Sequence, residues 1–392
     1  MHRSKTKTFS TRLILLMGLA GFLWVPANSI AGPRDQAKRI HDRITGIPPS
    51  SAVLTDMETD IIAGRAVDAA FTAMSNSAFY NVTLKNLVTP WTNEEQTVFA
   101  PLNDYSATVI GMIRDNIPFN TLLSADLLYI GDSNLGLPAY SMTDNNHYEA
   151  MENQGIDLQA NLVATTQSAM TSLPASATAG VMTTRAAAKA FFVAGTNRAM
   201  FRFTLLNHLC TDLEQIKDTT RATDRIRQDV SRSPGGDSRI FMNACVGCHS
   251  GMDPLAQAYA YYDYDEPANR LIYTPGNVQS KYLINANTFK HGYVTPDDRW
   301  DNYWRQGPNA LLGWDSSLSG AGNGAKALGR ELESSDAFAR CQVKKVFKAT
   351  CLRAPGNAAD RSQVTSLVNS FKASNYNLKQ VFAESAVYCM GD

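Results

Sequence analysis

Three residues in the middle of the chain have the types and the spacing for covalent attachment of a haem group. Cys245 and Cys248 are separated by two residues, and His249 follows the second cysteine directly, so the segment reads C-V-G-C-H. Two thiols three positions apart can form thioethers with the two vinyl groups of one porphyrin, and the next histidine is then held beneath the iron as its proximal ligand. The pattern therefore predicts one covalent c-type haem.

Other uses of a C-x-x-C pair fit this sequence less well. A redox pair normally lies in a thioredoxin-like βαβ unit, and no such context surrounds residues 245–249. A zinc site needs a second pair of ligands at similar spacing, and none follows. A plain disulfide between Cys245 and Cys248 would leave His249 without a role. Haem attachment is the interpretation that uses all three residues.

The sixth iron ligand has few candidates. Met252 is only three residues beyond His249 and cannot reach the opposite face of a porphyrin, and the next methionine is Met390. His291 is the only histidine downstream of the motif, and the glycine after it lets the backbone approach closely. We expect His249 and His291 to be the axial ligands, with a lower redox potential than a histidine–methionine pair. His208 or Met390 as ligand, or His291 as a solvent-exposed loop residue, remain open.

The segment after the motif predicts a helix with aromatic side chains. Asp253 and Pro254 have the types of an N-cap and a first helical residue, so we expect the helix to begin there and to continue through Tyr262. Its tyrosines are either a wall of the haem pocket or ordinary aromatic residues. Arg270 could pair with a haem propionate, although a surface arginine is the favoured interpretation.

The first 31 residues have the pattern of a secretory signal. Four basic residues and no acidic residue accompany an apolar run from Leu13 to Val25, and small residues end the segment at Ala31. The run has 13 residues, whereas a membrane-spanning helix needs about 20, so a membrane anchor is the weaker alternative. We expect cleavage near Ala31 and a periplasmic or secreted mature protein with no transmembrane segment.

Composition and charge limit the class of protein and of partner. The chain has 392 residues, and its hydrophobic fraction of 44% is ample for a folded core. Loss of the signal leaves 32 basic and 36 acidic side chains, a net charge of −4. That balance lacks the basic character of a nucleic-acid-binding protein. We expect a periplasmic redox protein as partner and no nucleic acid.

The remaining four cysteines are disulfide candidates in an oxidising compartment. They are Cys210, Cys341, Cys351 and Cys389, and four cysteines allow three connectivities. Cys341 and Cys351 lie on one predicted helix, about 15 Å apart, beyond the roughly 7 Å that a disulfide permits between Cα atoms. If the three terminal helices run up, down and up, Cys351 lies near Cys389. Cys341 is then left for Cys210.

The fold class predicted is mainly α. We expect a multi-helical N-terminal domain over residues 32–230, a cytochrome c-like haem region over 239–325 and a C-terminal three-helix domain over 326–392. A Gly-, Ser- and Pro-rich break over 231–238 separates the first two. Apolar residues at helical spacing predict helices over 34–45, 56–77, 154–171, 183–210, 325–351, 360–373 and 377–389. Residues 276–325 have loop or weak strand character.

Taken in order, several stretches resemble the planctomycetal-type cytochrome c family, exported bacterial proteins built from several domains. The strongest match is Cys245–Ala256, C-V-G-C-H-S-G-M-D-P-L-A, against the family pattern C-x-x-C-H-x-x-M-D-P-L-G. Shorter similar stretches are Arg43–Ser50, Phe119–Tyr129, Ala179–Thr184, Leu205–Thr211 and Leu328–Phe347. The chain departs from the family over residues 274–325 and at Cys351, where glycine is more usual. The resemblance implies a haem c and a terminal helical domain, but no substrate.

Two functions from different classes fit these features. The first is electron transfer by an exported mono-haem c-type cytochrome. The alternative is a haem enzyme, peroxidase-like or another oxidoreductase, whose iron has an open or displaceable sixth position. A third possibility is a helical scaffold in which the haem supports the fold. Roughly 210 mature residues precede the motif, more than one haem needs for burial, which favours an additional docking or substrate-binding role.

Overall fold

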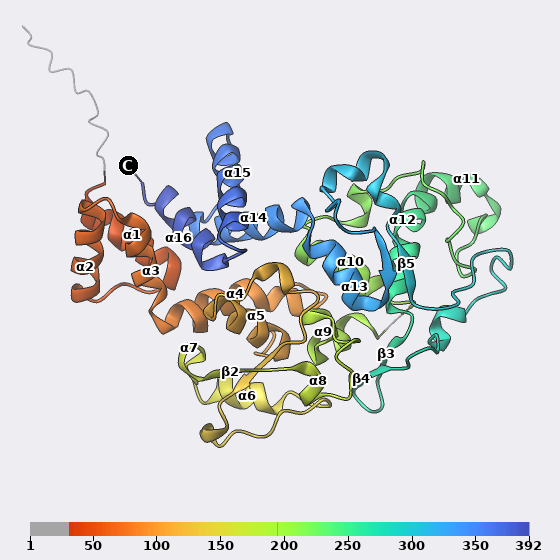
Figure 1. Ribbon diagram of the computed structural model, residues 1–392, viewed down its shortest axis with the longest axis horizontal. Helices are drawn as coiled ribbons and strands as arrows, with labels where there is room; N and C mark the ends of the chain where they lie inside the picture. The colour runs from red at the N-terminus through yellow and green to blue at the C-terminus, as the bar shows by residue number, and fades with distance from the viewer. Residues whose placement is uncertain (1–30, 194, 392) are drawn as a thin grey trace, which may run out of the picture.

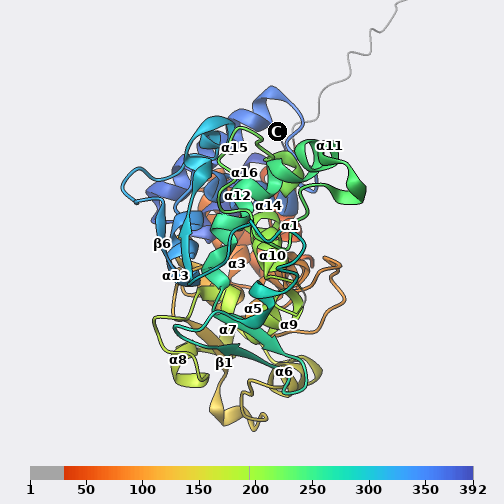
Figure 2. The ribbon, with the colours of Figure 1, turned by 90° about the vertical axis from the view of Figure 1, so that its right-hand side faces the viewer.

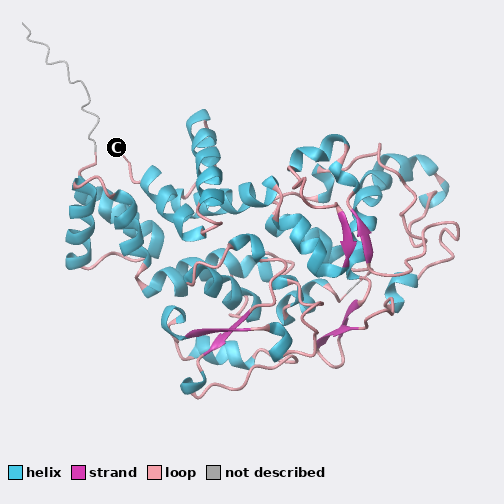
Figure 3. Ribbon diagram, viewed as in Figure 1, coloured by secondary structure: helices cyan, strands magenta, loops and turns pink. Residues whose placement is uncertain are grey.

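A computed structural model of the chain describes residues 31–193 and 195–391. These residues form sixteen α-helices and six short strands, and the strands pair into three antiparallel two-stranded sheets (Figure 1 and Figure 3). The predicted mainly α class is confirmed. The predicted signal lies, except for Ala31, outside the described residues. Among the helices described, none combines the length and the apolar character needed to cross a bilayer.

The two ends of the chain pack together at one end of the molecule. Figure 1 shows the first three helices beside the last ones, at the left of the view. These helices are α1 Pro33–Thr45, α2 Ser51–Ile62 and α3 Ala66–Met74, with α14 Asp336–Cys351, α15 Ala358–Ala373 and α16 Leu378–Tyr388. Helix α1 begins with a proline and ends at Gly46, whose φ of 76° gives the left-handed cap that glycine adopts readily. Its buried face includes Ile40 and Ile44.

A buried helix, α5, lies at the centre of the middle segment. All of its residues from Asp104 to Ile113 are buried. Helix α5 spans Asp104–Arg114 and packs against α4 Lys85–Val88, α7 Leu158–Asn161, α9 Arg185–Phe191 and the antiparallel pair β1 Leu128–Gly131 and β2 Leu162–Thr165. The same segment also contains α6 Asn146–Asn153, α8 Gln167–Met170 and α10 Arg198–His208. The central position of α5 joins the two ends of the molecule into one apolar core.

The segment with the C-x-x-C-H motif lies at the opposite end from the chain termini, and Figure 2 views the molecule from this end. It contains α11 Ser238–Ile240, α12 Val246–Ala256, the pair β3 Tyr262–Asp265 and β4 Arg270–Tyr273, the pair β5 Arg299–Asp301 and β6 Ala321–Asn323, and then α13 Gly324–Glu333. Residues 276–325, predicted as loop or weak strand, contain the short strands β5 and β6, turns, three short 3-10 helices (Ser280–Leu283, Tyr303–Arg305 and Gly307–Leu312) and the start of α13. The motif is carried by α12.

The predicted helix over residues 154–171 is wrong, because a strand interrupts it. Strand β2 pairs with β1, Gly131 lying opposite Leu162, and only single turns of helix flank it. The pairing with a distant strand overrides the local helical pattern. The predicted helices over 56–77, 183–210 and 325–351 are each broken into two. In the last of these, the Ser335 side chain accepts a hydrogen bond from the Phe338 amide and starts α14 anew.

The helix predicted to begin at Asp253 is also wrong. Helix α12 begins at Val246, Pro254 lies in its last turn, and it ends at Ala256, after which the chain turns into β3. Asp253 does not cap a helix because its carboxylate pairs with arginine side chains from two other segments. Aspartate before proline is typical of a helix start, but here the carboxylate of Asp253 is bound by residues that are distant in the sequence.

Both predicted disulfides are confirmed. Cys210 pairs with Cys341 and Cys351 pairs with Cys389, with Cα atoms 5.3 and 5.4 Å apart. Cys341 and Cys351 lie on the same helix, α14, as expected. The two bridges therefore attach α14 at one point to the end of α10 and at another to the end of α16.

We predict that the two disulfides differ in their contribution to stability. The first closes a separation of 131 residues and the second one of 38. Loop-closure entropy then gives losses of about 5 and about 4 kcal/mol when each pair is changed to alanine. Urea unfolding of the Cys210→Ala/Cys341→Ala and Cys351→Ala/Cys389→Ala proteins measures both. A larger loss for the second pair, or a 341–351 linkage in a non-reducing peptide map, would contradict the assignment.

Candidate haem attachment site

The motif residues share one face of α12. Cys245 directly precedes the helix, and Cys248 and His249 follow it at three and four positions, a spacing that puts side chains on the same side of a helix. All three are partly exposed. The structure leaves both cysteines unbonded, whereas the other four are bridged. The two thiols and the imidazole thus lie together, and each is accessible from outside the core.

The opposite face of α12 packs closely against neighbouring segments, and at Gly251 only glycine fits. A Cβ atom on Gly251 would lie 1.9 Å from the Trp304 indole nitrogen, and one on Gly247 would lie 3.3 Å from the Asp218 amide nitrogen. The Gly247 carbonyl also accepts a 2.8 Å hydrogen bond from that amide. This packing fixes the helix with its motif face outward.

A buried carboxylate orients the imidazole of His249. The Nδ1 atom lies 3.1 and 3.2 Å from the two carboxylate oxygens of Asp253, one helical turn further along. A carboxylate only accepts hydrogen bonds here, so Nδ1 carries the proton and Nε2 keeps its lone pair. Proteins use this arrangement to orient a metal-binding histidine and to make its free nitrogen more basic. The geometry leaves Nε2 as the ring nitrogen available to a metal.

Two arginines compensate the charge of Asp253, whose side chain is fully buried. Arg198 donates to both of its oxygens at 2.9 and 3.0 Å and also pairs with Asp229. Arg227 lies 3.8 Å from one oxygen, and its backbone amide donates to the other at 3.3 Å. Burial alone would raise the pKa of Asp253, but the two arginines hold it well below its ordinary value. The carboxylate is therefore charged and held in place.

Apolar side chains surround the start of the motif. Cys245 packs against a small apolar cluster made of Ile226, Val230, Phe241 and Val246, separate from the main core. Just before the motif, Ile240 and Met242 are 46% and 56% exposed. A porphyrin needs an apolar wall around the iron, and these residues offer one beside the cysteines. The surroundings of the motif fit a haem.

The loop that carries His291 packs beside this cluster. Phe289 donates to the Gln228 carbonyl and Tyr293 to the Ile226 carbonyl, both at 2.9 Å. A Cβ atom on Gly292 would lie 2.8 Å from the Gln228 backbone, so this glycine lets the loop approach that segment closely, and its expected approach to a porphyrin stays a prediction. The guanidinium of Arg232 lies over the Phe241 and Phe289 rings at 4.9 and 4.5 Å, as two separate contacts.

His291 itself is exposed at the surface of this loop. The other candidate ligands are less available. The Nε2 of His208 is 2.7 Å from the Tyr105 hydroxyl, and both rings are buried in the core. Met390 lies beside Arg39, at the opposite end of the molecule from α12. Met252 is buried in the main core. The exposure of His291 agrees with the alternative of a solvent-exposed loop residue, and its loop is hydrogen-bonded to Ile226, which packs beside Cys245.

Sequence reasoning missed the arginines that hold Asp253. They lie 55 and 26 residues upstream, and no local pattern connects them to the motif. The four-residue spacing between His249 and Asp253 could have predicted that contact, because side chains at i and i+4 of a helix are neighbours. Arg270 is exposed at the start of β4, as the favoured interpretation had it.

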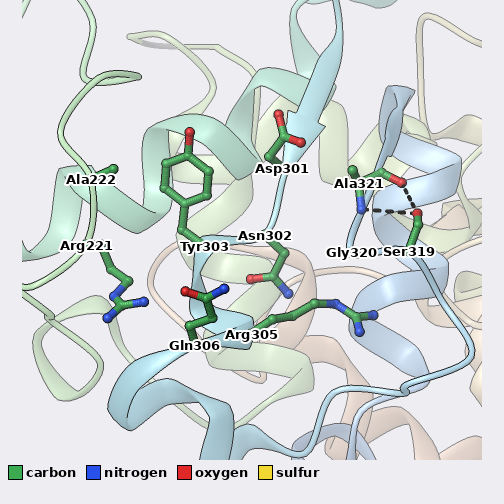
Figure 4. Close-up of a pocket in the computed structure, with 10 residues that line it drawn as sticks. All are labelled: Arg221, Ala222, Asp301, Asn302, Tyr303, Arg305, Gln306, Ser319, Gly320 and Ala321. Carbon is green, nitrogen blue, oxygen red and sulfur yellow. Dashed lines mark hydrogen bonds between the residues drawn. The ribbon is translucent and has the colours of Figure 1, made fainter.

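A cleft lies beside the strands β5 and β6 (Figure 4). It has a volume of about 520 Å³, and its lining includes Arg221, Tyr303 and Arg305. None of the three motif residues lines it. Within the part of the chain that the structure describes, no three His, Cys, Asp or Glu side chains cluster as metal ligands would.

Comparison with known proteins adds no assignment. No family model matches the chain, and no match was found among curated proteins or solved structures. The resemblance to the planctomycetal-type cytochromes therefore rests on the quoted motifs alone.

We predict that Asp253→Asn destabilises the protein by about 3–5 kcal/mol, the usual cost of removing one partner of a buried ion pair. The change leaves two largely buried arginines short of a counter-charge. Asp237→Asn is the matched control, since Asp237 pairs with the exposed Arg239 and asparagine also caps helices well. Urea unfolding compares the two. Equal small losses would show that the network around Asp253 is not structurally important.

Proposed function

We propose that this chain is an exported mono-haem c-type cytochrome that transfers electrons through a haem c attached to Cys245 and Cys248, with His249 as proximal iron ligand. The observation that carries the proposal is the pair formed by His249 and Asp253. Its hydrogen bond puts the proton on Nδ1 and leaves Nε2 free on the same face as two unbonded thiols. A plain disulfide between the cysteines would not require an oriented imidazole.

When bound, the haem supplies a one-electron couple. The residues of this chain bind and orient it. The cysteines would hold its edge, and the cluster around Phe241 and Val246, on which Cys245 packs, would shield it on one side from water. The negative charge of Asp253 would make His249 a stronger electron donor to the iron. It would thus favour the ferric state and lower the redox potential. Arg198 and Arg227 moderate this effect by compensating part of that charge.

The proposed location is the periplasm or the exterior of the cell. Two disulfides are compatible with an oxidising compartment, and the N-terminal sequence pattern is that of an export signal. The partner in this proposal is another periplasmic redox protein. The mature charge near neutrality gives no support for nucleic acid as a partner.

A haem enzyme is the second candidate, and one observation favours it. His291 is exposed on a loop, so its coordination would be displaceable by a small molecule. A hydrogen-bonded carboxylate on the proximal histidine also increases the electron density that the ligand gives to iron, which helps an open sixth position to activate an oxidant. The coordination of the sixth position separates the two functions.

Covalent attachment of haem to both thiols predicts that Cys245→Ala or Cys248→Ala lowers the yield of mature holoprotein. Each variant loses one of the two thioether bonds. His249→Ala should abolish the low-spin spectrum, since the iron loses its proximal ligand. Intact mass and a haem stain of denatured protein measure attachment in a strain with c-type maturation. Cys351→Ala/Cys389→Ala, which removes the bridge nearest the chain terminus and leaves the motif unaltered, is the control and should retain the haem. Full haem attachment in Cys245→Ala/Cys248→Ala would refute the site.

If His291 is the sixth iron ligand, His291→Ala gives a different result from His249→Ala. The ferrous spectrum should change from low spin to high spin, and the protein should gain carbon monoxide binding, because the distal position becomes open. Lys290→Ala, a change to the exposed neighbour on the same loop, should leave both properties unaltered. An unchanged low-spin spectrum in His291→Ala would remove this residue from the site. Carbon monoxide binding already in the wild-type protein would favour the enzyme.

A further inference from the structure

A second cleft lies far from the motif, where the two ends of the chain pack together. Its volume is about 760 Å³, and it lies between the C-terminal half of α1, the segment from Val82 to Trp91, and α14. The volume is in the range of sites for small organic ligands. Neither Cys245 nor His249 lines it. This cleft is therefore separate from the proposed haem site.

The charges in this cleft are unbalanced. Four cationic side chains line it, namely Arg39, Arg43, Lys345 and Lys348, against the single carboxylate of Asp42. That carboxylate already pairs with Lys38. Arg39, Arg43 and Lys345 donate to backbone carbonyls. Within the described residues, none of the four cations forms an ion pair with a carboxylate. The cleft carries positive charge that the described chain does not neutralise.

Lys345 is the most deeply placed of these cations. Its ammonium donates to the Asn207 carbonyl and lies 3.7 Å from the centre of the Trp91 ring. Burial lowers the pKa of Lys345 well below its ordinary value. An ammonium without a counter-ion in such a place is costly, whereas an anion beside it would offset the cost.

The cleft is rigid, because both disulfides flank it. Cys341 is one helical turn before Lys345 on α14, and its bridge to Cys210 holds the chain near Asn207. At the other end of the helix, Cys351 bridges to Cys389, whose carbonyl accepts from Arg43. A preorganised site loses little conformational entropy when a ligand binds.

Most of the remaining lining is apolar, with Thr83 and Asn86 as its polar members. Val82, Leu87 and Pro90 belong to it, together with Leu352 at its rim. Leu352 is 74% exposed and has a φ of 57°, in the left-handed region where glycine is usual at the end of a helix. An exposed leucine held in a strained conformation beside a cleft is a candidate contact for a ligand.

We propose that this cleft binds a small organic anion with an apolar body, such as an aromatic carboxylate. The carboxylate lies beside Lys345, and the apolar part lies against Trp91 and Leu352. Charge complementarity favours the anion, and the apolar lining favours the ring over inorganic phosphate. The large region upstream of the haem motif would then contribute a second binding site.

Calorimetry with two isosteric probes tests this proposal on the mature, disulfide-bonded protein. We expect 2-naphthoate to bind about tenfold more tightly than neutral 2-naphthamide, because only the acid meets the cationic groups. Lys345→Met should weaken naphthoate binding about tenfold without affecting the amide. Lys344→Met changes an exposed lysine on the same helix that does not line the cleft. It is the matched control and should bind as the wild type does.

Equal binding of acid and amide, no binding of either, or unaltered naphthoate binding by Lys345→Met would overturn the proposal. If Lys345→Met does not fold, Lys348→Gln replaces it, because Lys348 is exposed and lines the cleft. It should weaken naphthoate binding about threefold, and no change would overturn the proposal. Asp392→Asn, a change just after the described residues, should leave the affinity unaltered. A tenfold rise would identify the Asp392 carboxylate as the occupant and refute an external ligand.

Discussion

The buried charge of Asp253 is the constraint on which the arrangement around the motif depends. A carboxylate removed from water must be paired, and this one takes its partners from His249 on its own helix, from Arg198 on α10 and from Arg227 on the segment before the motif. Three segments of the chain therefore cannot separate without exposing or orphaning a charge. This is how a helix whose motif face is partly exposed can hold one imidazole in one orientation.

The same network explains which features could be predicted from sequence. The local spacing of Cys245, Cys248 and His249 predicts haem attachment without reference to the rest of the fold, and this stays a prediction. The start of α12 was predicted wrongly because Asp253 has the residue type of a helix cap, while its carboxylate is bound by arginines that are far away in sequence. Local patterns describe what a side chain can do, and tertiary partners decide which of its possible bonds it makes.

The disulfides were predictable for a related reason. Helical geometry alone excludes a bond between Cys341 and Cys351, and a simple arrangement of the last helices then leaves one pairing. By contrast, the cleft lined by Arg43, Trp91 and Lys345 brings together residues from three distant parts of the chain. No periodicity or motif connects these positions. They meet because α1 and α14 pack at the same end of the molecule, a long-range contact that sequence patterns did not predict.

The proposed function requires that the folded, exported chain carries one covalent haem whose iron is coordinated on both faces. Absorption spectra of the purified wild-type protein in the ferric and ferrous states, with and without carbon monoxide, test this most directly when the intact mass of the same sample is known. The account predicts the mass of the processed chain plus one haem, and a low-spin ferrous spectrum that carbon monoxide does not alter. A mature, folded protein whose mass includes no haem would contradict it.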